Sequence, residues 1–154
     1  MYLLSLVMFL AVLPLASIGL DHFVFRSSLP LFFLVGKWFA FWAVGIRLFL
    51  AGLRQLLQPR FTAEKIFGLT TDEPLPIVRE LGIANFSMGI LGILTLAKPA
   101  FLASIALLAA IFYGVAGLRH LTDPHKNLLQ NAAMLTDLFA SLVLIAYLVF
   151  AGLR

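Results

Sequence analysis

Three ionisable side chains interrupt otherwise apolar stretches of the chain, and their types could do chemistry together. They are Arg47, Glu80 and Asp137, each in a different stretch. A charge within a membrane is costly unless it is partnered, and such charges commonly mark paths for substrates or protons. Two carboxyl groups beside one guanidinium could bind a polar ligand or pass a proton. They could equally do no more than hold helices together.

The same three residues fall at one depth if the stretches are membrane-spanning helices. Each lies 16 or 17 residues from the outer end of its stretch. At 1.5 Å per residue this is roughly 24 to 26 Å, near the cytoplasmic edge of a hydrocarbon layer of about 30 Å. We therefore expect a polar cluster there, facing the cytoplasm. The candidate binding residues are Arg47, Glu80, Asn85, His120, Asn131 and Asp137.

A purely structural interpretation competes for each of the three charges. Arg47 is close enough to the interface for its long side chain to reach lipid phosphates. Glu80 could be an ordinary acidic residue in the first turn of a helix, where the helix dipole favours it. Asp137 is the hardest to explain in this way, because a carboxylate is too short to reach far.

The elements that must position these residues are apolar helices. The chain has 154 residues, of which 62% are hydrophobic and 12% charged, and its mean hydropathy is +1.06. Apolar runs of about 20 residues match the thickness of a bilayer, and the backbone of a spanning segment must satisfy its own hydrogen bonds. We predict an all-α polytopic membrane helix bundle, one domain over residues 1–154. Its five transmembrane helices are predicted at residues 2–20, 31–53, 77–97, 100–118 and 132–153.

The distribution of basic residues predicts the orientation. One side of a five-helix bundle would carry the N-terminus and the loops 54–76 and 119–131. The basic residues on that side are Arg54, Arg60, Lys65, Arg79, Arg119 and Lys126. Those on the other side are Arg26, Lys37, Lys98 and Arg154. Six against four predicts a cytoplasmic N-terminus and an outer C-terminus. The net charge of +4 then reflects topology, and we expect no nucleic-acid partner.

Small residues predict how the helices pack. The third helix carries one stripe formed by Gly82, Asn85, Gly89 and Gly92, and the fourth carries alanines and glycines between Ala103 and Gly117. Such stripes let membrane helices approach closely. Only Lys98 and Pro99 join these two helices, so we expect them to be antiparallel neighbours.

The two cytoplasmic loops also contain helix signals. Thr62 and Gly68 could begin and end a short segment, which is either a small interfacial helix or a compact loop. Asp123 followed by Pro124 is a favourable start for the last helix, several residues before the membrane.

Most catalytic chemistries lack their residues in this sequence. There is no cysteine, and the three histidines are His22, His120 and His125. Together with Asp123, the last two could in principle bind a metal, but the segment reads more simply as a polar turn. No hydrolase, zinc-protease or phosphate-loop motif is present. We therefore predict no metal site and no catalytic residue, and the sequence identifies no cofactor.

A short motif resembles a known group of proteins. The pattern E-x-G-x-A-N, formed by Glu80, Gly82, Ala84 and Asn85, precedes a helix ending in Gly–Leu–Arg–His and a last helix with Asn and Asp. Over roughly Pro59 to Tyr147 the chain resembles small polytopic bacterial membrane proteins of unknown function, in the neighbourhood of the DoxX-like families. That resemblance implies a four-helix fold in the bacterial inner membrane, in some members linked to quinones and sulfur oxidation. This chain would have one helix more.

Three classes of function remain open, and the third, a membrane-embedded enzyme, is the least favoured. The first is a binding or accessory protein, whose cytoplasm-side polar pocket takes a lipid- or quinone-like amphiphile or a membrane partner. The second is a small proton-coupled transporter or proton-conducting homo-oligomer, which would use Glu80 and Asp137 with Arg47 between them. A membrane-embedded enzyme would need a nucleophile or redox group that the sequence does not supply.

Overall fold

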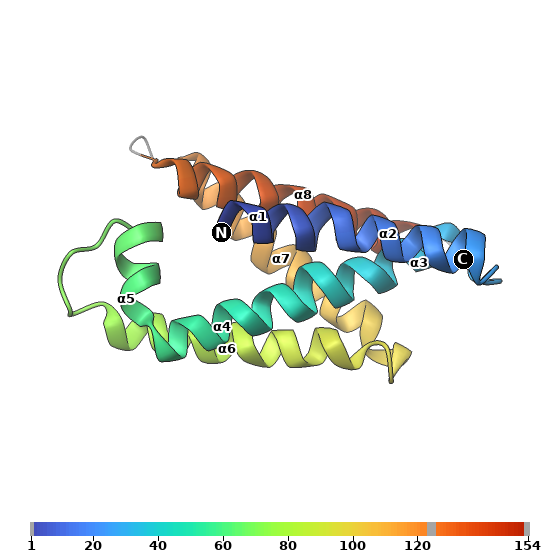
Figure 1. Ribbon diagram of the computed structural model, residues 1–154, viewed down its shortest axis with the longest axis horizontal. Helices are drawn as coiled ribbons and strands as arrows, with labels where there is room; N and C mark the ends of the chain where they lie inside the picture. Colours follow the sequence, from blue (N-terminus) through green and yellow to red (C-terminus); the bar gives the residue numbers. More distant parts are fainter. Residues whose placement is uncertain (1, 123–125, 153–154) are drawn as a thin grey trace.

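The computed structural model describes residues 2–122 and 126–152, and within them all regular structure is helical. Five helices are long and apolar enough to cross a membrane, which confirms the predicted fold class (Figure 1). They cover Leu3–Val24, Leu31–Leu57, Leu75–Leu94, Pro99–Leu121 and Leu128–Gly152.

The first two of these helices contain π-helical stretches, in which the backbone hydrogen bonds span five residues instead of four. The first helix consists of α1 (Tyr2–Val7), η1 (Met8–Val12), α2 (Leu13–Gly19) and η2 (Leu20–Val24). The second consists of α3 (Leu31–Phe39), η3 (Ala40–Ile46) and α4 (Arg47–Leu57).

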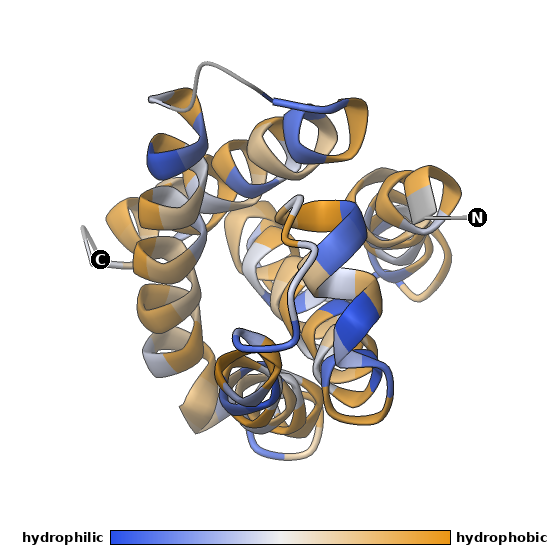
Figure 2. Cartoon of the chain, turned by 90° about the vertical axis from the view of Figure 1, so that its left-hand side faces the viewer, coloured by the Kyte–Doolittle hydropathy of each residue, from blue (hydrophilic) through white to orange (hydrophobic). Residues whose placement is uncertain are grey.

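The remaining elements follow in chain order. They are α5 (Pro59–Phe61) with the π-helical η4 (Thr62–Ile66), α6 (Leu75–Leu94), the 3-10 turn η5 (Pro99–Phe101), α7 (Leu102–Leu121) and α8 (Leu128–Gly152). The start of α1, the segments around α5, the end of α7 and the start of α8 all lie toward one end of the bundle (Figure 1). Seen from that end, the hydrophilic residues gather in and near these segments, over largely hydrophobic helices (Figure 2).

The glycine stripe of α6 packs against α4 and η3. A side chain at Gly89 would overlap the backbone of Phe49, and one at Gly92 would come within 2.6 Å of the Gly45 nitrogen. The expectation that α6 and α7 are close neighbours is wrong, because α7 packs mainly along α8. There the Ser141 hydroxyl donates a 2.8 Å hydrogen bond to the Ala110 carbonyl. A short connection brings helix ends together but does not determine which faces pack.

The ends of two helices also differ from their sequence signals. The short helix begins at Pro59, so Thr62 is a buried residue within it, although Gly68 follows its end with a φ of +69°. The expected start at Asp123 and Pro124 lies outside the described residues. In the described part α8 begins at Leu128, where Asn127 and Gln130 each accept a 2.8 Å hydrogen bond from the other's backbone N–H. This reciprocal arrangement is a capping box.

A separate polar contact ties the first helix to the second near their connection. Asp21 accepts hydrogen bonds from the Lys37 ammonium at 2.7 Å and the Trp38 indole at 2.8 Å. The Trp42 indole donates to the Ser17 hydroxyl at 3.0 Å. The predicted first helix ended before Asp21, whereas the structure continues it to Val24. The sequence does contain a signal for this contact. Ser17 and Asp21 are four residues apart and therefore lie on one face of a helix, and the same holds for Trp38 and Trp42.

The glycine contact yields a stability prediction. Gly89→Ala should lower the free energy of unfolding by about 1–3 kcal/mol, because the added methyl group meets backbone that cannot move aside. Thermal unfolding in detergent measures the effect.

The control is Gly19→Ala, since a Cβ at Gly19 meets nothing within 4 Å. Gly36 would be a poor control because the ring of Tyr147 packs directly against it. Equal melting temperatures for the Gly89 and Gly19 variants would contradict close packing of α6 on α4.

Candidate functional site

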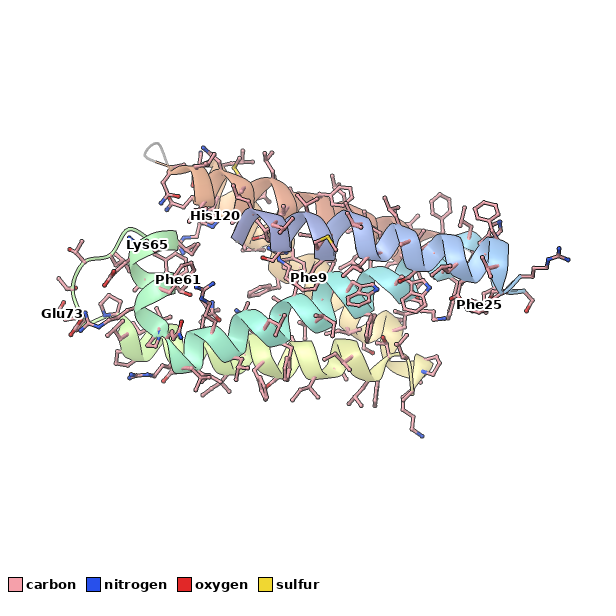
Figure 3. All side chains as sticks on the ribbon, in the orientation of Figure 1. Phe9, Phe25, Phe61, Lys65, Glu73 and His120 are labelled. Carbon is pink, nitrogen blue, oxygen red and sulfur yellow. The ribbon has the colours of Figure 1, made fainter. Side chains whose placement is uncertain are left out.

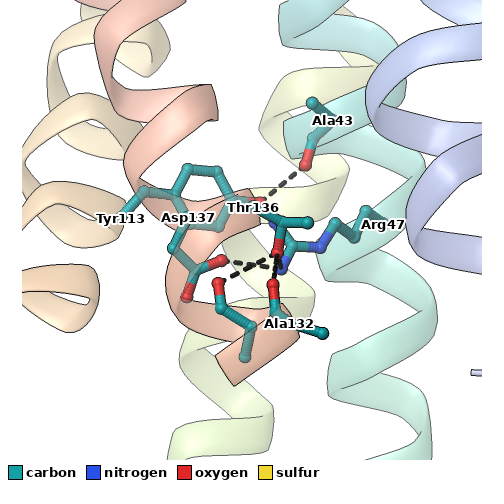
Figure 4. A network of polar contacts seen from close by, with 7 residues as sticks. Ala43, Arg47, Tyr113, Ala132, Thr136 and Asp137 are labelled. Atoms are coloured by element: carbon teal, nitrogen blue, oxygen red, sulfur yellow. Dashed lines mark hydrogen bonds and ion pairs between the residues drawn. The ribbon is translucent and has the colours of Figure 1, made fainter. Parts of the chain in front are cut away.

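A buried ion pair joins α4 to α8. The Arg47 Nη2 atom lies 2.7 Å from the Asp137 Oδ1 atom, and each side chain is 12% exposed. The same nitrogen lies 3.5 Å from the Thr136 hydroxyl oxygen, and the guanidinium stands 5.0 Å from the centre of the Tyr113 ring (Figure 4). Two residues 90 positions apart in sequence thus neutralise each other between helices.

The π-helical stretch before Arg47 takes part in this arrangement. The Arg47 N–H bonds to the Trp42 carbonyl five residues back and to the Val44 carbonyl three residues back, instead of to the Ala43 carbonyl four residues back. The Ala43 carbonyl accepts a 2.6 Å hydrogen bond from the Tyr113 hydroxyl of α7 (Figure 4). Because Tyr113 is buried, its hydroxyl needs such a partner. Three helices therefore meet at Arg47.

Glu80 does not join this ion pair. Its side chain is exposed on α6, and in the described part of the chain it makes no ion pair. Of the three charges expected to form a cluster, only Arg47 and Asp137 therefore meet. The reason is rotation about the helix axis: Glu80 precedes Gly82 by two residues, or roughly 200°. The glycine face of α6 contacts α4, so Glu80 points elsewhere.

A cavity of about 450 Å³ opens beside the ion pair. Residues from α1, η1, α4, α5, η4, α6, α7 and α8 line it, together with Phe67 directly after η4. Figure 3 shows Phe9, Phe61 and His120 around the space between α1, α4 and α5. Most lining residues are apolar, and the charged ones are Arg47, Arg54, Arg119 and Asp137.

The other predicted site residues fall into two groups. Asn85 and the half-buried His120 line the cavity. Asn85 is 4% exposed and its amide nitrogen donates a 2.8 Å hydrogen bond to Gln55 Oε1. Asn131 is half-buried and does not line the cavity; its backbone N–H bonds to the Asn127 carbonyl at the start of α8.

Two arginines that line the cavity, Arg54 and Arg119, are not among the predicted binding residues. The sequence marks them only as basic residues near helix ends. Arg54 follows Arg47 by seven residues, which returns a helix to the same face. Its guanidinium carbon lies 3.4 Å from the centre of the Phe61 ring. Arg119 lies six residues after Tyr113 on α7 and also lines the cavity. The seven-residue spacing was a usable signal for Arg54, whereas nothing in the sequence places Phe61 over it.

Few of the side chains that line the cavity carry a hydroxyl group. These hydroxyl groups belong to Ser5, Thr62 and Tyr113. The Tyr113 hydroxyl is engaged by the Ala43 carbonyl. No group of three metal-ligating side chains occurs in the described ranges, and the Asp123 and His125 of the metal alternative lie outside them.

Five apolar helices with charges paired between them define a helical multi-pass membrane protein. The chain belongs to a family of unknown function, DUF6790, whose pattern matches residues 2–153. Comparison with curated proteins and with solved structures finds no match.

The ion pair yields a second stability prediction. Asp137→Asn should lower the free energy of unfolding by about 3–5 kcal/mol, because it leaves a buried guanidinium without its counter-charge. Glu80→Gln removes an exposed carboxylate and should leave the melting temperature in detergent nearly unchanged. A comparable loss in both variants would show that Glu80 also has a buried partner.

Proposed function

We propose that this protein binds an amphiphile, a membrane lipid or a quinone-like molecule, in the cavity beside Arg47 and Asp137. The observation that best supports this proposal is the cavity itself. Its volume of about 450 Å³ falls within the 300–1,000 Å³ of typical small-molecule sites. Apolar walls with a few polar groups are also typical of such sites.

The cavity's position in the bundle supports an amphiphile over a fully polar ligand. Arg54 and Arg119 lie in the last turns of α4 and α7, and Phe61 comes from the segment that follows α4. Apolar residues such as Leu6 and Phe9 line other parts of the cavity. A ligand with a polar head and an apolar body would match both parts.

The distribution of basic residues supports an orientation of the protein in its membrane, and the resemblance to bacterial proteins supports a choice of membrane. We propose a bacterial inner membrane, with the N-terminus and the cavity on the cytoplasmic side. The resemblance to DoxX-like proteins is the reason to keep quinone-like molecules among the candidates. The protein would act as a binding or accessory subunit, alone, as a homo-oligomer or with a membrane partner.

The transport alternative has less support. It required Glu80 and Asp137 to share Arg47, and Glu80 is exposed on another face of α6. A single paired carboxylate has a simpler explanation in helix packing. We therefore favour binding over proton conduction.

Filling the cavity tests the proposal. Ala116→Trp should reduce the lipid or quinone that copurifies in mild detergent by at least tenfold, because Ala116 lines the cavity and the indole would occupy it. Mass spectrometry of the extracted molecules measures the amount.

Ala103→Trp is the matched control, since Ala103 is exposed on the same helix and does not line the cavity. Equal amounts of bound amphiphile in the two variants, both folded, would refute binding in this cavity.

A further inference from the structure

We infer that the amphiphile carries an anionic headgroup, a phosphate, and that Arg54 and Arg119 bind it. This inference rests on the proposed function and narrows it, because a quinone-like ligand would be neutral. The reasons lie in the charge of the cavity, the geometry of Arg54 and an unpaired buried acceptor.

The cavity has an excess of positive charge. Three guanidiniums and one carboxylate line it, and the carboxylate of Asp137 is paired with Arg47. Among the residues that the structure describes, neither Arg54 nor Arg119 has a carboxylate partner. Within the described ranges, two positive charges thus remain for a ligand. Charges of this kind in a partly enclosed cavity attract anions strongly, since low-dielectric walls focus the field.

The two arginines come from different helices and share one cavity. A cation near a helix C-terminus is favourable on its own because of the helix dipole, so position alone would not indicate a ligand. Arg54, Arg119 and Arg79 are all exposed, and Arg79 differs from the other two in that it does not line the cavity. The guanidinium group offers several N–H donors in a planar fork that fits phosphate oxygens.

Arg54 is already held in place. Its guanidinium stacks on Phe61 at 3.4 Å, and Phe61 belongs to the short α5 segment at the same end of the cavity. Stacking restricts a side chain that would otherwise lose much conformational freedom on binding. It leaves the edge of the fork, which carries the N–H donors, available for an anion.

Asn85 provides an independent indication of a polar ligand. Its side chain is 4% exposed and lines the cavity, and its Oδ1 atom has no hydrogen-bond partner in the described part of the chain. A buried acceptor without a partner is costly. The Oδ1 atom has almost no surface open to solvent, so a hydroxyl group on the ligand would reach it after a small shift of the neighbouring side chains. A glycerol phosphate headgroup offers both the anion and the hydroxyl donors.

The test compares two single-chain lipids of equal acyl length by titration in native mass spectrometry. Lysophosphatidylglycerol is the anionic probe and lysophosphatidylcholine the zwitterionic one. The wild-type protein should bind the anionic probe at least tenfold more tightly, a difference of about 1.4 kcal/mol. That preference should fall as ionic strength rises, because salt screens exposed charges.

The informative variant is the double substitution Arg54→Gln with Arg119→Gln. It should lose the tenfold preference and still bind the zwitterionic probe, whereas Arg79→Gln should behave as the wild type. Equal affinity of the wild type for both probes would overturn the inference, as would a preference that survives the double substitution. Should the double variant not fold, the salt dependence of the wild type decides in the same way.

Two further arms separate the related outcomes. If inorganic phosphate alone displaces the anionic probe at equal concentration, the ligand is a free anion, and the amphiphile is refuted. If both lipids bind with equal affinity and Ala116→Trp abolishes both, the proposed function stands and only the anionic headgroup is refuted. If Ala116→Trp leaves both affinities unchanged, the proposed function itself fails.

Discussion

The requirement that buried charge be neutralised inside the bundle governs this structure. Arg47 and Asp137 come from helices far apart in sequence, and each is tolerable at its depth because of the other. Their contact fixes the separation of α4 and α8, and Tyr113 of α7 stands over the guanidinium and donates to the backbone before it. An apolar pair of residues could pack as tightly, but would not select one partner among many apolar faces.

The cavity follows from how the helices are paired. α6 lies on α4 through glycine contacts, and α7 lies along α8. At the end that holds the C-terminus, Gly36 of α3 meets the Tyr147 ring of α8, which brings the two pairs together. At the opposite end α4 and α8 diverge (Figure 1), and Phe61 of α5 lines the cavity. The ion pair also lines the cavity, so the contact between α4 and α8 contributes to the cavity wall.

Hydropathy and length were enough to predict the five helices, because a bilayer imposes a minimum run of apolar residues. Counting along those helices gave the common height of Arg47, Glu80 and Asp137, but height says nothing about direction around the axis. The direction of the Glu80 side chain could have been predicted from the glycine stripe of α6, because Glu80 does not lie on that face of the helix. The role of Phe61 could not be predicted, because it depends on how a loop segment folds back over Arg54. The packing of α7 along α8 was not predicted either, because the short connection between α6 and α7 favoured α6 as the neighbour of α7.

The π-helical stretch Ala40–Ile46 has a consequence for how this chain tolerates change in length. Each residue of an α-helix advances the direction of the side chains by about 100°. In the π-helical stretch each hydrogen bond spans five residues, so the turn holds one residue more than an α-helical turn, and the residues beyond it keep the direction they would have after an α-helix one residue shorter. Deleting one residue there would therefore restore an α-helix, while Arg47 and Arg54 kept their direction. Deleting one residue between Arg47 and Arg54, within regular α-helix, would instead turn Arg54 by about 100° relative to Arg47. A difference of one residue in length should therefore be tolerated in Ala40–Ile46 and be harmful in α4.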